Sequence, residues 1–335
     1  MLTVGQKNLD SHSAHIFKPD TTLIKIPQKP FQARVHLLLL FSTTLVSTSF
    51  IVAEFITDTL DPIALTFIRF LLAVLLLLPL IWVKHGLVIS VSSLGRYAAI
   101  SGCLVLFFWA MFFSLRFTTS LNISVLFTLV PAISAVYAGI INRERLSLSL
   151  LLALIAGLIG AIWVIFEGDL QQLRALAWNR GDLIFFGGCL AMALYTPLVK
   201  LLHRDEPMEV MTFWVLVTGC LWLLPGTVKV LARVSLTGVP SSTWLWIVYL
   251  ALFSTVISFY STQYATRIIG PTRTISYSYL YPLLVMVLNY LLGRGWPPLP
   301  VIPGILLTLA AMLLLLPTPP ETDKGAVDNQ GPARG

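Results

Sequence analysis

The sequence predicts an all-α polytopic membrane protein with ten transmembrane helices, arranged as two inverted five-helix repeats. Three observations predict this class: the composition, a series of apolar segments, and a punctuation pattern that occurs twice. Hydrophobic residues make up 57% of the 335 residues, charged residues only 11%, and the mean hydropathy is +0.85. Because a soluble domain carries about 25% charged residues, this chain has too few charges to cover a water-facing surface.

A membrane-spanning helix needs about 20 mostly apolar residues. Ten segments meet this requirement: 35–56, 62–82, 95–115, 118–141, 147–166, 182–202, 209–229, 243–264, 271–292 and 299–316. Residues 1–34 and 317–335, which lack an apolar core, are expected to be cytoplasmic tails.

The repeat is visible in residues 116–145, which return as 267–296 at an offset of 151 residues. The aligned pairs are Arg116 with Arg267, Pro131 with Pro282, and Arg143 with Arg294. The predicted units are therefore a first five-helix repeat over 35–168 and a second over 178–316. Since five is odd, the second repeat enters the membrane from the opposite side, a topology typical of secondary transporters with a substrate site near the midplane.

The distribution of basic residues predicts the orientation. With the N-terminus inside, the inner segments hold fifteen of the 22 Lys and Arg residues and the outer segments hold six. Both termini are therefore expected on the cytoplasmic side, with the bacterial inner (plasma) membrane as the location. The net charge of +7 is assigned to these loops and not to a nucleic-acid partner, because no basic run carries interleaved aromatic residues.

The chain lacks the usual motifs of enzymes and pumps. It has no GxxxxGK[ST] loop and no HExxH, and its three cysteines, Cys103, Cys189 and Cys220, are isolated. The outer connection 167–181 is too short for a catalytic domain. We therefore expect no enzyme activity, no cofactor and no metal site.

Four stretches resemble the drug/metabolite transporter superfamily, in particular its ten-helix EamA-type members. They are DPIALTFIRFLLAVLLL at 61–77, TSLNISVLFTLVPAISAVYAGIINRERLS at 119–147, GDLIFFGGCLAMALYTPLVK at 181–200 and GPTRTISYSYLYPLL at 270–284. The chain departs from the family pattern at Gly295, where a glutamate is usual, and at Ala153, where a glycine is usual. The resemblance implies a ten-helix bundle that moves small organic metabolites, often outward, without ATP hydrolysis. Amino acids or related amphipathic compounds are the cargo that it implies.

Two charged residues are expected inside spans, where a charge costs about 2.5–3.5 kcal/mol on insertion scales. Arg69 lies about 10 Å along the second helix from Pro62, and Glu54 is the acidic residue expected within a span at comparable depth. We expect Arg69 to pair with Glu54 or to extend outward to the headgroups. A structural role and a direct role in substrate binding or proton coupling both stay open for this pair.

Six residues are candidates to line a substrate cavity: Trp109, Asn122, Tyr260, Gln263, Tyr277 and Ser278. Trp109 aligns with Tyr260 across the repeat, so both halves offer an aromatic side chain at the same level. Aromatic faces bind flat or cationic organic molecules, but aromatic residues also form interfacial belts. The polar candidates either line the path or bond across helices.

Pro131 and Pro282 are hinge candidates, since a proline inside a helix removes a backbone hydrogen bond and bends the helix. The small residues Ala153, Gly157 and Ala161, spaced every four positions, are interpreted as a helix-packing stripe. Glu144 lies in a charged turn that is expected to set topology or to act as a gate.

The sequence thus favours a secondary transporter whose partners are a small-molecule substrate and the lipid bilayer. Protons are a candidate coupling ion, and uniport stays open. The alternative is a non-transporting membrane assembly or sensory partner built on the same bundle.

Overall fold

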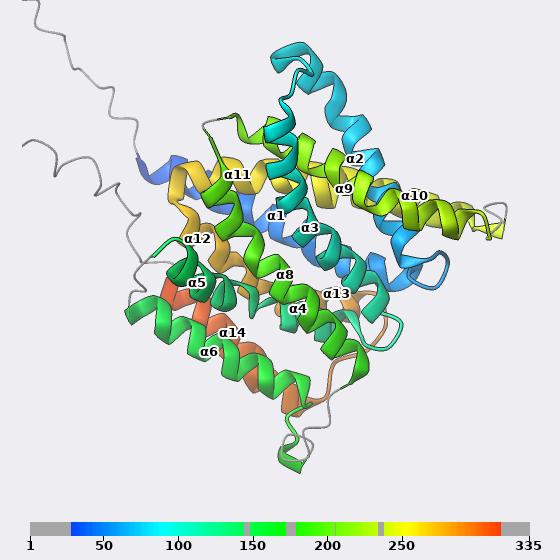
Figure 1. Cartoon of the computed structure of the whole chain (residues 1–335). Helices are drawn as coiled ribbons and strands as arrows, with labels where there is room; N and C mark the ends of the chain where they lie inside the picture. The colour runs from blue at the N-terminus through cyan, green and yellow to red at the C-terminus, as the bar shows by residue number, and fades with distance from the viewer. Residues whose placement is uncertain (1–27, 144–147, 172–178, 205, 234–237, 316–335) are drawn as a thin grey trace, which may run out of the picture.

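The computed structural model is helical, and no strand occurs in the residues that it describes (Figure 1). The described residues are 28–143, 148–171, 179–204, 206–233 and 238–315. The all-α prediction is confirmed for this part of the chain. The charged turn at Glu144 and most of the two expected tails lie outside the described residues.

The helices follow one another through short connections. In chain order they are α1 (Gln28–Ile56), α2 (Pro62–His85), α3 (Val91–Ser114), α4 (Ser120–Phe127), α5 (Val130–Ile141), α6 (Leu148–Ile165), α8 (Arg180–Leu202), α9 (Met208–Leu231), α10 (Ser241–Ala251), the π-helical turn η2 (Leu252–Ile257), α11 (Ser258–Ile269), α12 (Pro271–Ser276), the 3-10 turn η3 (Tyr277–Leu280), α13 (Tyr281–Leu291), the 3-10 turn η4 (Leu299–Val301) and α14 (Ile302–Leu315).

Seven helices in the described residues are long and apolar enough to cross a membrane, by length and composition. Two shorter apolar helices, Leu150–Ile165 and Leu299–Leu315, lie where the fifth and tenth spans were predicted. The ninth predicted span, 271–292, is divided among α12, η3 and α13. The structure therefore confirms a polytopic membrane protein but not the count of ten spanning helices.

The helix starts follow from local chemistry. Asp61 caps α2, because its carboxylate accepts a hydrogen bond from the N–H of Ile63 at 2.8 Å, and Pro62 then occupies the first turn without losing a helical bond. Asn179 caps α8 in the same way, through a 2.7 Å bond from the N–H of Gly181. The Asp-Pro motif of the sequence is thus a helix-start signal that fixes where α2 begins.

The two hinge-candidate prolines each begin a new helical segment. Pro131 lies in the first turn of α5, and the N–H groups of Thr128 and Leu129 just before it bond to carbonyls three residues back, as in a 3-10 turn. Pro282 lies in the first turn of α13, directly after the 3-10 turn η3. At both positions the regular helix is interrupted just before the proline, which itself interrupts no helical bond, and the hinge role stays a prediction.

Helices α6 and α14 lie side by side along their lengths (Figure 1). They approach closely at two glycines: a Cβ atom on Gly160 would lie 2.7 Å from the carbonyl oxygen of Gly304, and a Cβ on Gly304 would lie 2.7 Å from that of Gly160. Ala153 and Ala161 are fully buried, and Gly157 lies against the ring of Tyr279. The packing interpretation of the small-residue stripe is confirmed.

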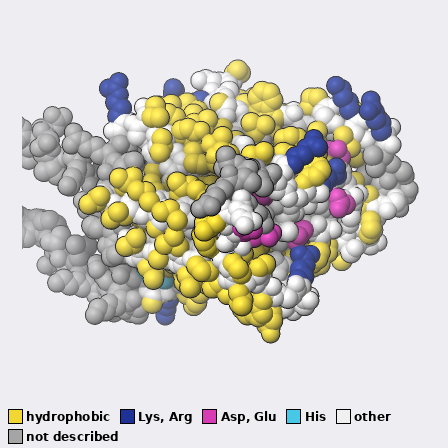
Figure 2. Space-filling model, turned by 90° about the horizontal axis from the view of Figure 1, so that it is seen from below, with side chains coloured by type: hydrophobic (Ala, Val, Ile, Leu, Met, Phe, Trp, Pro, Cys, Tyr) yellow, Lys and Arg dark blue, Asp and Glu magenta, His cyan; other side chains and the backbone are white. Residues whose placement is uncertain are grey.

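The outer surface is largely apolar. Hydrophobic side chains cover much of the face seen in Figure 2, and the acidic side chains visible there gather in one part of it. Large hydrophobic residues such as Leu37, Trp82, Val83 and Leu313 are more than half exposed. A surface of this kind suits lipid and not water.

Candidate functional site

A cavity of about 500 Å³ lies where nine elements from both halves of the chain converge. We call it the central cavity. It is lined by the aromatic residues Phe50, Phe107, Phe108, Phe127, Tyr195, Phe259 and Tyr281, the methionines Met111, Met192 and Met208, the polar residues Ser49, Thr196, Ser254, Ser258, Thr262, Gln263 and Thr266, and Val46, Arg69 and Val199. An apolar cavity of this size with a few convergent polar groups is the usual form of a small-molecule site.

Arg69 of α2 lines this cavity and is only 1% exposed. Its Nε donates to Thr255 Oγ1 at 3.0 Å, and its Nη2 donates to Ser254 Oγ at 3.3 Å. The guanidinium carbon lies 4.3 Å from the ring centroid of Phe108. In the described part of the chain, Nη1 has no hydrogen-bond partner. Arg69 therefore neither pairs with Glu54 nor extends outward, which corrects both sequence-based expectations.

The π-helical turn η2 explains how two neighbouring hydroxyls reach the same guanidinium. Consecutive residues of an α-helix point about 100° apart and do not face the same neighbour. In η2, Thr255 Oγ1 donates to the carbonyl of Leu250, five residues back, at 3.0 Å, and accepts from Arg69. The widened turn lets Ser254 and Thr255 contact Arg69 together. The sequence pattern did not predict this π-helical turn.

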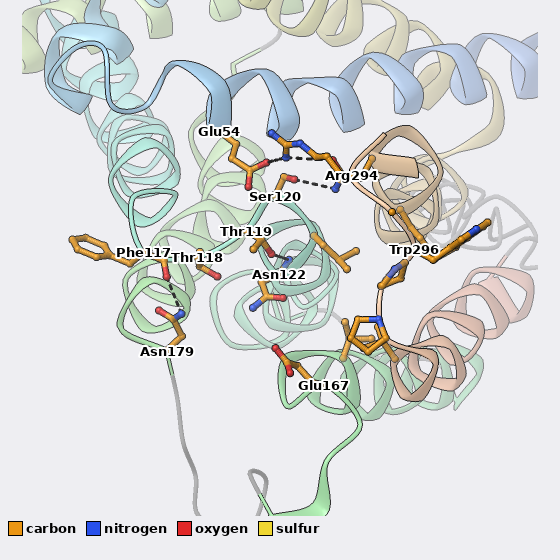
Figure 3. Close-up of a pocket in the computed structure, with 18 residues that line it drawn as sticks. Glu54, Phe117, Thr118, Thr119, Ser120, Asn122, Glu167, Asn179, Arg294 and Trp296 are labelled. Carbon is orange, nitrogen blue, oxygen red and sulfur yellow. Dashed lines mark hydrogen bonds and ion pairs between the residues drawn. The ribbon is translucent and has the colours of Figure 1, made fainter. Parts of the chain in front are cut away.

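A second pocket of about 490 Å³ lies at one end of the bundle, and we call it the end pocket (Figure 3). It is lined by Glu54, residues 117–122, Val164, Glu167, Asn179, Met286, Asn289, residues 294–298 and Val301. Glu54 of α1 forms an ion pair with Arg294, which follows α13, and the two face one another in Figure 3. Glu54 thus has a partner 240 residues away, instead of the expected Arg69.

Asp182 is a buried acidic residue that the sequence reasoning missed, since Glu54 was the acidic residue expected within a span. Its side chain is 1% exposed, accepts a hydrogen bond from Thr118 Oγ1 at 2.5 Å, and lies 3.4 Å from Asn122 Nδ2. The residue lies in the first turn of α8, where the helix dipole favours negative charge. The signal was present in the sequence, as an acid directly after a glycine at a span start.

Three aromatic side chains, which we call the aromatic triad, lie between the two pockets. The ring centroids of Phe50 and Phe127 are 6.0 Å apart, those of Phe50 and Tyr281 5.8 Å, and those of Phe127 and Tyr281 5.4 Å. Glu54 lies about one turn beyond Phe50 on α1, and Met286 lies about one turn beyond Tyr281 on α13. Both Glu54 and Met286 line the end pocket. The triad therefore forms the wall of the central cavity on the side of the end pocket.

A polar cluster at the opposite end of the bundle joins α3 to the connection between α8 and α9. Glu206 Oε1 lies 3.2 Å from Arg96 Nη1 and 3.0 Å from the hydroxyl of Tyr97, and Oε2 accepts from the N–H of Arg204 at 2.9 Å. Burial acts to raise the pKa of the Glu206 carboxyl. The opposite effect comes from these hydrogen bonds, from a further hydrogen bond donated by its own backbone N–H, and from the positive charge of Arg96, and together they outweigh burial. The pKa of Glu206 is therefore lowered from its usual value.

The polar cavity candidates fall into three places. Gln263 lines the central cavity, where its Nε2 donates to Thr212 Oγ1 at 2.9 Å. Tyr277 and Ser278 line a side pocket of about 170 Å³ that shares Phe127, Met192 and Tyr281 with the central cavity, and the hydroxyl of Tyr277 lies 2.7 Å from His36 Nδ1. Pro131 also lines this side pocket. Asn122 lines the end pocket.

The two aligned aromatic candidates do not line the central cavity. Trp109 is half-buried and stacks on Phe113, with ring centroids 5.3 Å apart. Tyr260 is 64% exposed and borders a neighbouring hollow. Phe108 and Phe259, the aligned pair one residue earlier, line the cavity instead. The alignment gave the correct level in both halves, but one residue along a helix changes the direction of a side chain by about 100°.

One family profile matches most of the chain. The profile of the EamA-like transporter family matches residues 33–166 and again 179–316. The chain is 25% identical over 283 residues to the uncharacterized transporter YyaM of Bacillus subtilis, covering 83% of this chain and 92% of that protein. It is also 25% identical over 285 residues to an uncharacterized transporter of Archaeoglobus fulgidus, covering 84% and 97%. A solved crystal structure shares the fold, with a TM-score of 0.61 at 17% identity over 84% of this chain and 96% of that one.

Proposed function

Because this chain belongs to the EamA-like transporter family and is a multi-pass membrane protein, we propose that it is a secondary transporter of small organic metabolites. It works by alternating access between two inverted repeats, over 35–168 and 178–316. Its cargo consists of amino acids or related amphipathic compounds, which it exports across the bacterial inner membrane. Cargo and direction are proposed on the family resemblance. Both termini face the cytoplasm, in line with the distribution of basic residues.

The observation that carries the proposal is the central cavity, which both halves of the chain line. A transporter with repeated halves binds its cargo where the repeats meet. The rival function, a non-transporting assembly or sensory partner, predicts a plugged interior. The open cavity with convergent polar groups supports the transporter.

The helix packing supports two structurally equivalent repeats. In the proposed repeats α1 corresponds to α8, and α3 corresponds to α10 and α11. The packing of α3 on α8 then has its counterpart in α11 on α1, that of α4 on α8 in η3 on α1, and that of α5 on α8 in α13 on α1. In the pair α2 with α9, and likewise in the pair α6 with α14, the two helices are equivalent to one another, so exchanging the repeats leaves each pair unchanged. A twofold axis between the repeats generates this set of pairs.

The aromatic triad supports alternating access. It separates the central cavity from the end pocket, whereas Val199, Met208 and Thr266 extend the lining toward the end of the bundle that carries Glu206. In the proposed orientation that end is cytoplasmic, so the cavity faces inward and the triad closes it outward. Access from the other side then requires the triad to part.

The test is transport of a labelled amino-acid panel in proteoliposomes, measured as uptake and efflux with and without a pH gradient. Saturable movement of at least one compound, absent from protein-free vesicles, is expected. Sensitivity to the gradient would assign coupling to protons and make Asp182→Asn and Glu54→Gln the first variants to compare. Saturable movement indifferent to the gradient would assign uniport. A panel in which nothing moves faster than in protein-free vesicles would contradict transport of amino acids.

A further inference from the structure

We infer that the central cavity binds an organic carboxylate through Arg69, and that its preferred cargo carries one negative charge on an aromatic or large apolar body. The inference rests on the proposed function and narrows its cargo, from amino acids and related amphipathic compounds to amphipathic carboxylates without an ammonium group. It stands on three features of this chain: an incompletely bonded guanidinium, the absence of a carboxylate from the described cavity lining, and the aromatic walls.

The guanidinium of Arg69 has its donors only partly used. Ser254 and Thr255 take Nη2 and Nε, whereas Nη1 is buried and unpartnered in the described part of the chain. Leaving a buried donor unbonded is costly, and the cost is greater when the group is charged. An anion in the cavity that reaches Nη1 supplies both the missing acceptor and the missing countercharge. A carboxylate fits best, because its two oxygens match the planar fork of arginine.

The charge balance of the cavity distinguishes among carboxylates. Among the described residues of its lining, Arg69 is the one charged side chain. Glu209 borders the neighbouring hollow that shares Gln263, and its Oε1 lies 3.4 Å from His85 Nε2. An α-ammonium group that enters the central cavity would therefore lose its hydrating water without finding a protein carboxylate to pair with. A plain carboxylate is expected to bind more tightly than the corresponding amino acid.

The walls set the body of the ligand. The ring of Phe108 lies over the guanidinium, and Phe107, Phe127 and Tyr281 continue the aromatic lining from there. Aromatic rings prefer edge-to-face or offset contact with another ring, and methionines adapt their shape to fill the rest. A phenyl-sized group joined to a carboxylate by a short chain matches this arrangement.

Four compounds with the same body and different charges test the inference. They are 3-phenylpropionate (anion), phenylalanine (zwitterion), 3-phenylpropanol (neutral) and 2-phenylethylamine (cation). Binding is measured by calorimetry on the purified full-length protein in lipid nanodiscs. The carboxylate is expected to bind about 10- to 100-fold more tightly than the alcohol, the range for a hydrogen bond to a charged group, with phenylalanine between them. Equal or tighter binding of the amine, or no binding of the carboxylate at millimolar concentration, would overturn the inference.

Two variants assign the preference to Arg69. Arg69→Gln is expected to bring the affinity for 3-phenylpropionate down to that for 3-phenylpropanol while leaving the alcohol unchanged. Arg69→Lys keeps the charge and is expected to retain part of the preference. If Arg69→Gln does not purify as a monodisperse protein, Ser254→Ala replaces it; because it removes the acceptor that holds Nη2, it is expected to change the affinity for the carboxylate and not that for the alcohol. An unchanged preference for the carboxylate in Arg69→Gln would contradict the assignment.

The same labelled carboxylate in proteoliposomes separates this inference from the proposed function. Charge-selective binding without movement of any compound would leave the binding site intact and contradict transport. Saturable movement of all four compounds at similar rates, with no selectivity in binding, would keep transport and contradict the carboxylate site.

Discussion

Glu206 is the residue whose ionisation we expect to control stability in acid. Its pKa is lowered in the folded protein, so its carboxylate stabilises the folded state above the pKa of the unfolded chain. This contribution is lost as the pH falls through the folded-state pKa. The melting temperature of wild type should exceed that of Glu206→Gln at neutral pH, and the difference should shrink as the pH falls through the folded-state pKa of this carboxyl.

Thermal unfolding in detergent across this pH range measures the effect of Glu206. Asp58→Asn is the matched control, because the carboxylate of Asp58 lies 3.8 Å from Arg116 but is 83% exposed. It should change the melting temperature little at any pH. A difference between wild type and Glu206→Gln that persists in acid would contradict the role given to this carboxylate.

The Glu54–Arg294 pair closes one side of the end pocket and should behave as a coupled unit. Glu54→Gln and Arg294→Gln are each expected to lower the melting temperature, and the double variant should lose less than the sum of the two. The coupling should be about 0.5–1 kcal/mol, because both side chains are partly exposed. Strictly additive losses in a double-mutant cycle would show that the pair contributes no interaction energy.

Residue positions were more predictable than residue partners. The depth of Arg69 followed from its distance to Pro62, because a helix rises uniformly along its axis. Its partners Ser254 and Thr255 lie about 185 residues away and meet it through a π-helical turn, which depends on tertiary packing. Similarly, nothing in the local sequence of Glu54 could identify Arg294.

At the scale of elements, one close contact in the bundle is the backbone approach of α6 to α14. Gly160→Ala would place a methyl group 2.7 Å from the carbonyl oxygen of Gly304 and 3.1 Å from the nitrogen of Thr308. Backbone atoms cannot rotate away as a side chain can, so the helices must separate. We expect a destabilisation of about 1–3 kcal/mol, seen as a lower melting temperature.

Gly187→Ala is the control for this substitution. Gly187 also lies inside a helix, but an added Cβ there meets nothing within 4 Å. Alanine should therefore be neutral or stabilising by about 0.5–1 kcal/mol, its advantage in helix propensity. Equal effects at the two glycines would show that the contact between α6 and α14 is looser than described.

Elements with a local chemical cause were the predictable ones. The start of α2 at Pro62 and the small-residue stripe of α6 follow from capping and from side-chain size. The breaks before Pro131 and Pro282 were only half predicted: the prolines marked the positions, but the short 3-10 turns that precede them did not show in the apolar pattern.

For the molecule as a whole, the proposed inverted repeats require equivalent turns to lie on opposite sides of the membrane. In a background without Cys103, Cys189 and Cys220, Asp58→Cys reports the turn after α1, and Arg204→Cys the turn after α8. An impermeant maleimide should label the first in intact cells and the second only after permeabilisation. Labelling of both turns from the same side would contradict the inverted arrangement.

Whole-chain properties were readable from composition and spacing. The membrane class and the family follow from apolar segments and ordered motifs, which need no knowledge of contacts. The number of spanning helices is harder to predict, because a segment such as 271–292 is apolar enough to span yet divides into three short helical pieces.

The π-helical turn η2 has no counterpart in the first half, where the aligned residues 101–106 lie within the regular helix α3. A carrier with two identical halves would rest equally often facing each side of the membrane. If the protein alternates between two orientations as proposed, the turn makes the halves unequal, so the two resting orientations of the empty protein differ in free energy. One compartment then meets a ready binding site more often than the other, so the half-saturating concentration of cargo differs between the two sides, while the net flux without a gradient stays zero.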